Sequence, residues 1–143
     1  MKTVLSLMLA ALLVSTGVAA PQAQQQKPAP ASGLEKALIG TWNGSWTGGS
    51  GGTVTFTFVR GTDGKLGGSA APQPNDGQGY TTNFTSVVVA DDKVTMKMLT
   101  PDGGAEITVQ ATVAGADMKG TYAVKGGDGS EVESGTIVAK KKA

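Results

Sequence analysis

Two carboxylates near the C-terminus, Glu131 and Glu133, come nearest in this sequence to the spacing of an enzymatic acid–base pair. Two residues apart on a β-strand, their Cα atoms would lie about 6.5 to 7 Å apart. This range overlaps the carboxyl separation of an inverting glycosidase, roughly 6.5 to 9.5 Å. Glycosidase acids flank a sugar cleft from different elements, whereas the pattern places these two together on the solvated face of the last strand. We therefore expect a surface pair without a catalytic role.

Other reactive constellations are missing from the sequence. The chain has no histidine and no cysteine, which excludes a Ser-His-Asp triad, thiol nucleophiles, disulfides and the usual zinc sites. G-x-S-x-G occurs only as the glycine-rich turn at 48–52 (GGSGG), in a chain with no histidine to activate its serine, and no G-x-x-x-x-G-K-[ST] segment occurs. Residues 126–131 (GGDGSE) have a faint similarity to one calcium-binding nonapeptide repeat, but such repeats act in arrays. We predict a hairpin turn there and a protein that is not an enzyme and needs no metal or cofactor.

The charges nearly cancel, with 12 Lys and Arg against 11 Asp and Glu. Binding to a phosphate backbone needs a basic surface, so no nucleic-acid partner is expected. The basic run at 140–142 (KKK) is shorter than the roughly 4 to 8 charges typical of sites for anionic lipid. We predict a solvated tail there and a monomeric protein.

The N-terminus has the three parts of a secretory signal peptide. Lys2 supplies the positive charge, residues 4–14 form an apolar run, and small residues follow at Gly17 and Ala19. The run is too short to span a bilayer, which takes roughly 20 residues. We predict a signal peptide at 1–19, cleavage after Ala19, no membrane span, and a secreted or periplasmic protein of a bacterium.

The following segment, 20–33, is rich in Pro, Gln and Ala and carries one charge. Because such a composition has little to bury, it predicts an extended, disordered linker. A single domain is expected at 34–143. It begins with weak helical spacing at 34–39 (LEKALI), which we interpret as one turn that plugs the fold.

From Gly40 onward, apolar and polar residues alternate with a period of two, which indicates β-strands with one buried face. Gly-rich and Asp-Gly turns separate short segments about ten residues apart. The inward face of the last segment is ambiguous. The predicted strands are 40–47, 53–60, 66–71, 84–89, 94–99, 105–113, 118–125 and 131–140.

The short connections leave no room for crossover helices, so the sheet is expected to be antiparallel. About eight strands in sequential order favour an all-β, up-and-down barrel, which leaves no exposed edge. A β-sandwich is the alternative. An outer-membrane barrel would carry its apolar residues outside, whereas the aromatics here fall on the candidate inward positions.

The sequence Gly40-Thr41-Trp42 is a G-x-W at the opening of the first strand. In a small, secreted, β-rich chain it resembles the calycin superfamily of lipocalins, fatty-acid-binding proteins and avidins. The chain is also similar to small β-domains of uncharacterised secreted bacterial proteins, through residues 38–44, 64–69, 86–96 and 118–122.

The calycin resemblance implies a lipocalin-like barrel in which Trp42 packs across the closed end against a cation from the last strand. Lys140 is the counterpart that it implies, where Arg is usual. The second lipocalin motif is missing, and the chain has too few aromatics for the tryptophan-lined pocket of an avidin, which disfavours biotin.

The same resemblance implies a ligand pocket inside the barrel. A Met-rich, aromatic wall would suit a small apolar ligand, but small barrels are often filled by their own side chains. Three hypotheses therefore stay open: a carrier of a small apolar ligand, a filled module that binds protein or envelope polymer through its surface, and a hydrolase that uses Glu131 and Glu133. The candidate interior residues are Trp46, Phe56, Phe58, Met96, Met98, Ile107, Val109, Met118 and Tyr122.

Overall fold

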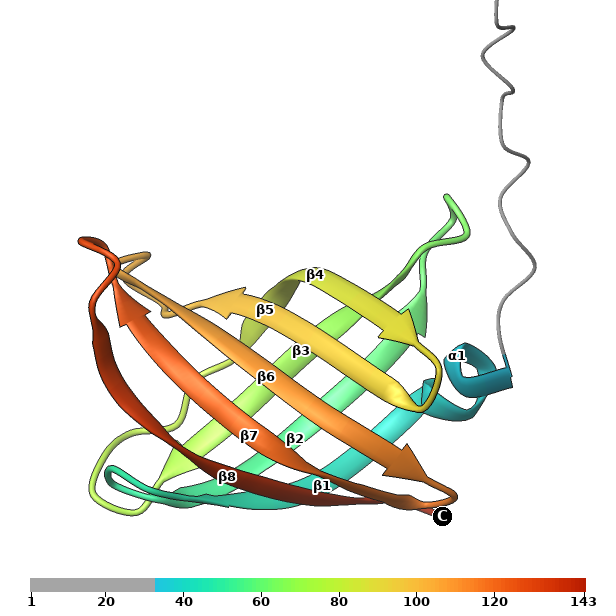
Figure 1. Ribbon diagram of the computed structural model, residues 1–143, viewed down its shortest axis with the longest axis horizontal. Coiled ribbons are helices and arrows are strands. Elements are labelled where there is room, and N and C mark those ends of the chain that lie inside the picture. The colour runs from blue at the N-terminus through green and yellow to red at the C-terminus, as the bar shows by residue number, and fades with distance from the viewer. Residues whose placement is uncertain (1–32) are drawn as a thin grey trace, which may run out of the picture.

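The structure is a computed structural model that describes residues 33–143. A short helix and eight strands make up its fold (Figure 1). The predicted signal peptide and nearly all of the predicted linker lie outside the described residues. The helix α1 spans Gly33–Leu38, where a plugging turn was predicted. The strands are β1 (Gly40–Thr47), β2 (Gly52–Arg60), β3 (Leu66–Pro74), β4 (Thr82–Ala90), β5 (Lys93–Leu99), β6 (Ala105–Ala114), β7 (Asp117–Gly126) and β8 (Glu131–Lys141).

The strands form a closed barrel in sequential order, and β8 returns to pair with β1. All neighbours are antiparallel. This confirms the predicted up-and-down barrel and excludes the sandwich. Among the described residues, no helix is long and apolar enough to cross a membrane.

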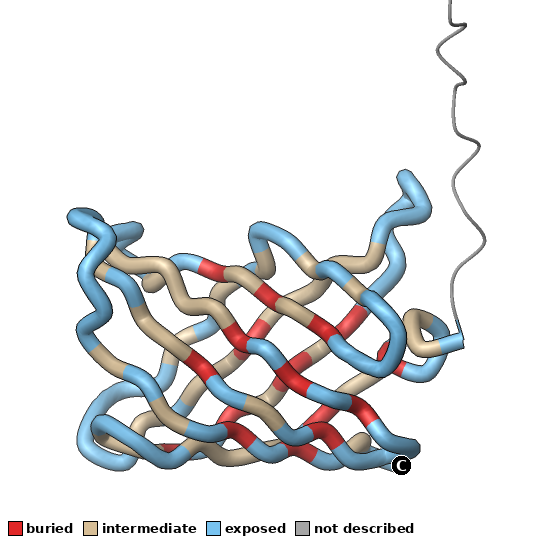
Figure 2. The backbone as a smooth tube through the Cα atoms, viewed as in Figure 1, coloured by how far each residue is buried: buried red, intermediate tan, exposed pale blue. Residues whose placement is uncertain are grey.

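The predicted alternation sets the inside of the barrel, as the buried positions in Figure 2 show. On β2, for example, Val54, Phe56 and Phe58 are buried while the threonines between them are more exposed. The inward face of β8, ambiguous in the sequence, is fixed by buried Ile137 and Ala139. The buried core consists of Leu38, Trp42, Val54, Phe56, Phe58, Ala70, Val94, Met96, Met98, Val109, Ala111, Val113, Met118, Tyr122, Ile137 and Ala139.

The strand β3 continues to Pro74, three residues beyond the predicted end, because it pairs with β2 along its whole length. Toward β4 it pairs only at Ser69–Asn83 and Ala70–Thr82. Proline has no N–H to donate to a neighbouring strand, so Pro72 and Pro74 are compatible with the part of β3 that does not pair with β4. The seam between β3 and β4 is therefore the weakest in the barrel.

The two ends of the barrel differ. The helix α1 lies at the end where β1 begins and β8 finishes (Figure 1). Its Leu38 is fully buried. The opposite end carries the β1–β2, β3–β4, β5–β6 and β7–β8 connections. The fold thus has one plugged end and one end bordered only by loops.

Candidate functional site

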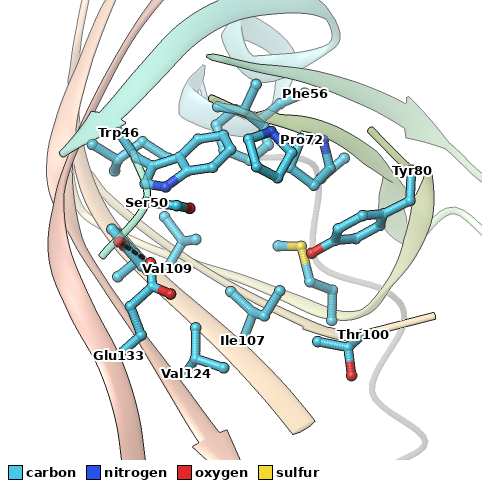
Figure 3. A pocket seen from close by; sticks show the side chains of 16 residues that line it. Trp46, Ser50, Phe56, Pro72, Tyr80, Thr100, Ile107, Val109, Val124 and Glu133 are labelled. Atoms are coloured by element: carbon cyan, nitrogen blue, oxygen red, sulfur yellow. Dashed lines mark hydrogen bonds between the residues drawn. The ribbon is translucent and has the colours of Figure 1, made fainter. Parts of the chain in front are cut away.

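A cavity of about 190 Å³ occupies the loop-bordered end of the barrel (Figure 3). Its walls come from every strand except β4, together with residues of three connecting loops. Most of the wall is aromatic or aliphatic. The lining residues are Trp46, Ser50, Val54, Phe56, Ala70, Pro72, Pro74, Tyr80, Met98, Thr100, Ile107, Val109, Tyr122, Val124, Glu133 and Ile137.

Six of the nine candidate interior residues line this cavity: Trp46, Phe56, Met98, Ile107, Val109 and Tyr122. The other three, Phe58, Met96 and Met118, are fully buried and belong to the packed core instead. Phe58 stacks near Phe84 at a ring-centroid distance of 5.3 Å, and Phe56 lies 6.4 Å from both rings. The interior is therefore filled on the plugged side and hollow on the loop side.

Glu133 also lines the cavity, which corrects the prediction that it shares an outer face with Glu131. The register between β7 and β8 shifts, so that Val124 pairs with Glu133 but Lys125 pairs with Glu131. Directly opposite residues of an antiparallel pair share a face, and Lys125 is exposed while Val124 lines the cavity. The bulge therefore turns Glu131 outward and Glu133 inward, and the two carboxylates cannot act on one substrate.

The Tyr122 hydroxyl lies 2.6 Å from Oε1 of Glu133 and 3.0 Å from the main-chain oxygen of Gly48. Both oxygens are acceptors, so the single hydroxyl proton is shared between them. Burial, followed by the hydrogen bond to Glu133 and its negative charge, raises the pKa of Tyr122. Tyr122 therefore stays neutral and anchors Glu133 to the β1–β2 turn.

That turn is built from glycines because other side chains would collide with the site. A Cβ at Gly49, where φ is +53°, would overlap the carboxyl group of Glu133. A Cβ at Gly52 would lie 2.6 Å from Cη2 of Trp46, whose indole covers this cross-strand glycine. The glycine-rich turn thus allows Glu133 and Trp46 to pack closely against the backbone.

Several polar atoms at the cavity have no hydrogen-bond partner among residues 33–143. They are Nε1 of Trp46, the hydroxyls of Ser50 and Tyr80, and Oε2 of Glu133. Burial, followed by the negative charges of Glu133 and Asp102, raises the pKa of Tyr80, so its hydroxyl also stays protonated. The cavity therefore offers both donors and acceptors to a molecule inside it.

Tyr80 and Glu133 line the cavity but are absent from the candidate interior residues predicted from the sequence. Tyr80 follows an irregular Pro-rich loop, and no periodic pattern assigns its direction. Glu133 was detectable, because counting back in steps of two from the apolar pair Ile137 and Ala139 places residue 133 on the inner face. Within the described part of the chain, no three Asp or Glu side chains converge as a metal site.

At the plugged end, the predicted partner of Trp42 was wrong by one residue. The Nζ atom of Lys141 lies 6.0 Å from the Trp42 ring centroid and donates a 2.6 Å hydrogen bond to the main-chain oxygen of Ala37. Lys140 points outward, where it lies 3.3 Å from a carboxylate oxygen of Asp117. Inward residues of β8 have odd numbers from Glu133 to Lys141, so only Lys141 can reach the indole.

No family model and no curated protein matches the chain. Similar solved structures exist among redesigned β-barrels. The barrel b11L5F_LGL has a TM-score of 0.62 and 18% identity over 77% of this chain and 96% of its own. A structure of EF1p2_mFAP2b bound to DFHBI has a TM-score of 0.61 and 20% identity over 76% of this chain and 97% of its own. The redesigned barrel mFAP1 bound to DFHBI has a TM-score of 0.59 and 19% identity over 76% of this chain and 98% of its own. At such identities the likeness concerns the fold alone: this chain shares the β-barrel fold of those proteins.

Proposed function

We propose that the protein is a non-enzymatic binding protein that holds a small, largely apolar molecule in the cavity at the loop-bordered end. The observation that carries this proposal is the cavity itself, an apolar space with a few polar atoms that the protein leaves without partners. Ligand sites have this character, since apolar walls supply affinity and a few polar groups fix orientation. An apolar cavity of about 150 Å³ accepts benzene, so about 190 Å³ suits a one- or two-ring molecule.

The architecture supports this proposal. The packed core and the plug at α1 leave the loop-bordered end as the side of access. Seven of the eight strands hold the walls in place, and a preformed site avoids the entropy of ordering on binding. Two barrels of similar fold have been solved bound to DFHBI. Secretion to the periplasm or exterior, inferred from the first 19 residues, remains part of the proposal.

A direct test is isothermal titration of the protein with 2-phenylethanol, a one-ring probe that has both an apolar body and a hydroxyl. Val124→Phe fills the cavity from β7 and should abolish binding. Val138→Phe is the matched control, because it adds the same ring to an exposed, outward position on β8 and should leave binding unchanged.

If the probe does not bind, or if both variants bind it as the wild type does, the cavity is not the binding site. Native mass spectrometry of protein purified from its producing cells then decides between the hypotheses. An added mass that disappears on denaturation identifies the natural ligand. A bare mass, together with failure of the probe, favours a module that works through its outer surface.

A further inference from the structure

Glu133 is the one charged side chain among those that line the cavity. It lies in an otherwise apolar or neutral wall, opposite Tyr80 in the view of Figure 3. No lysine or arginine lines the space. A carboxylate in such surroundings gives the cavity a negative potential that low-dielectric walls strengthen.

The protein satisfies this carboxylate only in part. Oε1 of Glu133 shares one hydroxyl proton of Tyr122 with Gly48, and within the described residues Oε2 has no hydrogen-bond partner. Two carboxylates elsewhere on the barrel, Glu106 and Asp117, do have cations. Lys97 lies 3.0 Å from Glu106, and Lys140 lies 3.3 Å from Asp117. A half-buried charge without a counter-ion is costly, so Glu133 offers an unused site for a positive group.

The aromatic rings around the cavity favour the same kind of group. Trp46, Tyr80 and Tyr122 line it together with Glu133, and the faces of such rings attract cations. Both tyrosines stay neutral hydroxyls, so neither adds a competing charge. The part of the wall that contains Met98, Ile107 and Val109 is apolar.

We propose that the ligand is a small aromatic or aliphatic amine in its ammonium form. Its N–H groups face Glu133 and its apolar body lies against Ile107 and Val109. This inference rests on the proposed function, since it names the class of ligand for the same cavity. The sequence predicts a small apolar ligand, and the carboxylate of Glu133 in the cavity wall adds a positive group to that ligand.

Three one-ring probes of similar size test the preference by isothermal titration at pH 7: phenethylamine, 2-phenylethanol and 3-phenylpropanoate, which carry an ammonium, a hydroxyl and a carboxylate. Charge-assisted hydrogen bonds are stronger than neutral ones. We expect phenethylamine to bind roughly ten-fold or more tightly than the alcohol, and the carboxylate to bind most weakly.

Glu133→Gln should remove most of the preference for phenethylamine while the alcohol still binds, because glutamine keeps the size and an acceptor for Tyr122. Glu131→Gln removes the same charge from the outer face two residues away and should leave the preference intact. If the alcohol binds as tightly as the amine, or if Glu133→Gln keeps the preference, the ammonium inference is overturned and the proposed function stands. If no probe binds the folded wild-type protein, both are overturned.

Discussion

The indole Nε1 of Trp42 donates a 2.8 Å hydrogen bond to the main-chain oxygen of Leu38, four residues earlier in the chain. Both side chains are fully buried. The bond satisfies a carbonyl at the last residue of α1, where helices leave acceptors without intrahelical partners. One tryptophan therefore fills the barrel end and holds the helix against it.

Replacing Trp42 should destabilise the barrel more than replacing the other tryptophan on the same strand. Trp42→Phe leaves a space and deprives the buried Leu38 oxygen of its donor, which costs about 2 to 4 kcal/mol. Trp46 has no such bond and lines a cavity, so Trp46→Phe should cost less than about 1.5 kcal/mol. Urea denaturation of both variants measures the difference. Equal losses would show that the Trp42 contact does not hold the plugged end.

The neighbouring lysines provide a second comparison. Lys141→Met removes the contact with the Trp42 ring and the hydrogen bond to Ala37, and should lower the unfolding free energy by about 1 to 2 kcal/mol. Lys140→Met removes an exposed ion pair with Asp117, whose effect should stay within about 0.5 kcal/mol. Thermal melts of the two variants check this order. The reverse order would restore Lys140 as the partner of the tryptophan.

The raised pKa values of the two tyrosines predict that the protein loses stability at high pH. Burial raises the pKa of both Tyr80 and Tyr122 above the value of about 10 that applies to the unfolded chain. The unfolded state therefore loses these protons first, so stability falls as pH rises above about 10. Tyr122→Phe should make the unfolding free energy less dependent on pH between about 10 and 12. Absorbance at 295 nm should show tyrosinate forming late or together with unfolding. Ordinary titration near pH 10 in the folded state would contradict the assignment.

The fold could be predicted from the sequence because a strand with one solvent-exposed face alternates apolar and polar residues with a period of two, and this pattern is visible within each short segment. Phe56 and Phe58 alternate with threonines, and Asp-Gly and Gly-rich turns separate the runs. The same alternation predicted part of the cavity wall. Whether an inward residue packs in the core, as Met118 does, or lines a cavity depends on what lies across the barrel, and no local pattern encodes that.

The errors concern the last strand, β8, whose inward face the sequence left ambiguous. Glu133 keeps the inward alternation of Ile137 and Ala139, and the bulge between β7 and β8 turns only Glu131 outward, while the pairing shows that Lys141 rather than Lys140 points inward. One extra residue in a strand switches every side chain beyond it to the other face. The charged member of the site was therefore missed, although its apolar neighbours were predicted.

Gly49 allows a test of the position of Glu133. An alanine there would adopt a left-handed backbone and overlap the glutamate carboxyl group. Gly64 is the matched control, because it also has a positive φ, +79°, with open space around it. Both alanine variants should lose roughly 1 kcal/mol of stability. Only Gly49→Ala should weaken phenethylamine binding relative to 2-phenylethanol. If both variants bind alike, the turn does not position Glu133.

The seam between β3 and β4 should open more readily than any other in the barrel. The two strands pair only at Ser69–Asn83 and Ala70–Thr82, whereas β6 and β7 pair along their whole length. Beyond Ala70, the hydrogen bond from the Tyr80 N–H to the Pro72 oxygen, 3.2 Å long, links β3 to its following loop in place of a ladder. Local opening has a lower free energy where fewer hydrogen bonds must break.

Hydrogen exchange followed by mass spectrometry should therefore show amides of residues 66–84 exchanging roughly ten-fold or more faster than those of 105–124. Because Ala70, Pro72 and Tyr80 line the cavity, an occupant that contacts them stabilises the closed seam. Saturating 2-phenylethanol should slow exchange at 66–84 more than at 105–124, and Val124→Phe, which fills the cavity, should remove that response. Uniform exchange around the barrel would show that the short ladder is no weaker than the others. Slowing that is equal in all strands would indicate global stabilisation without a role for the seam.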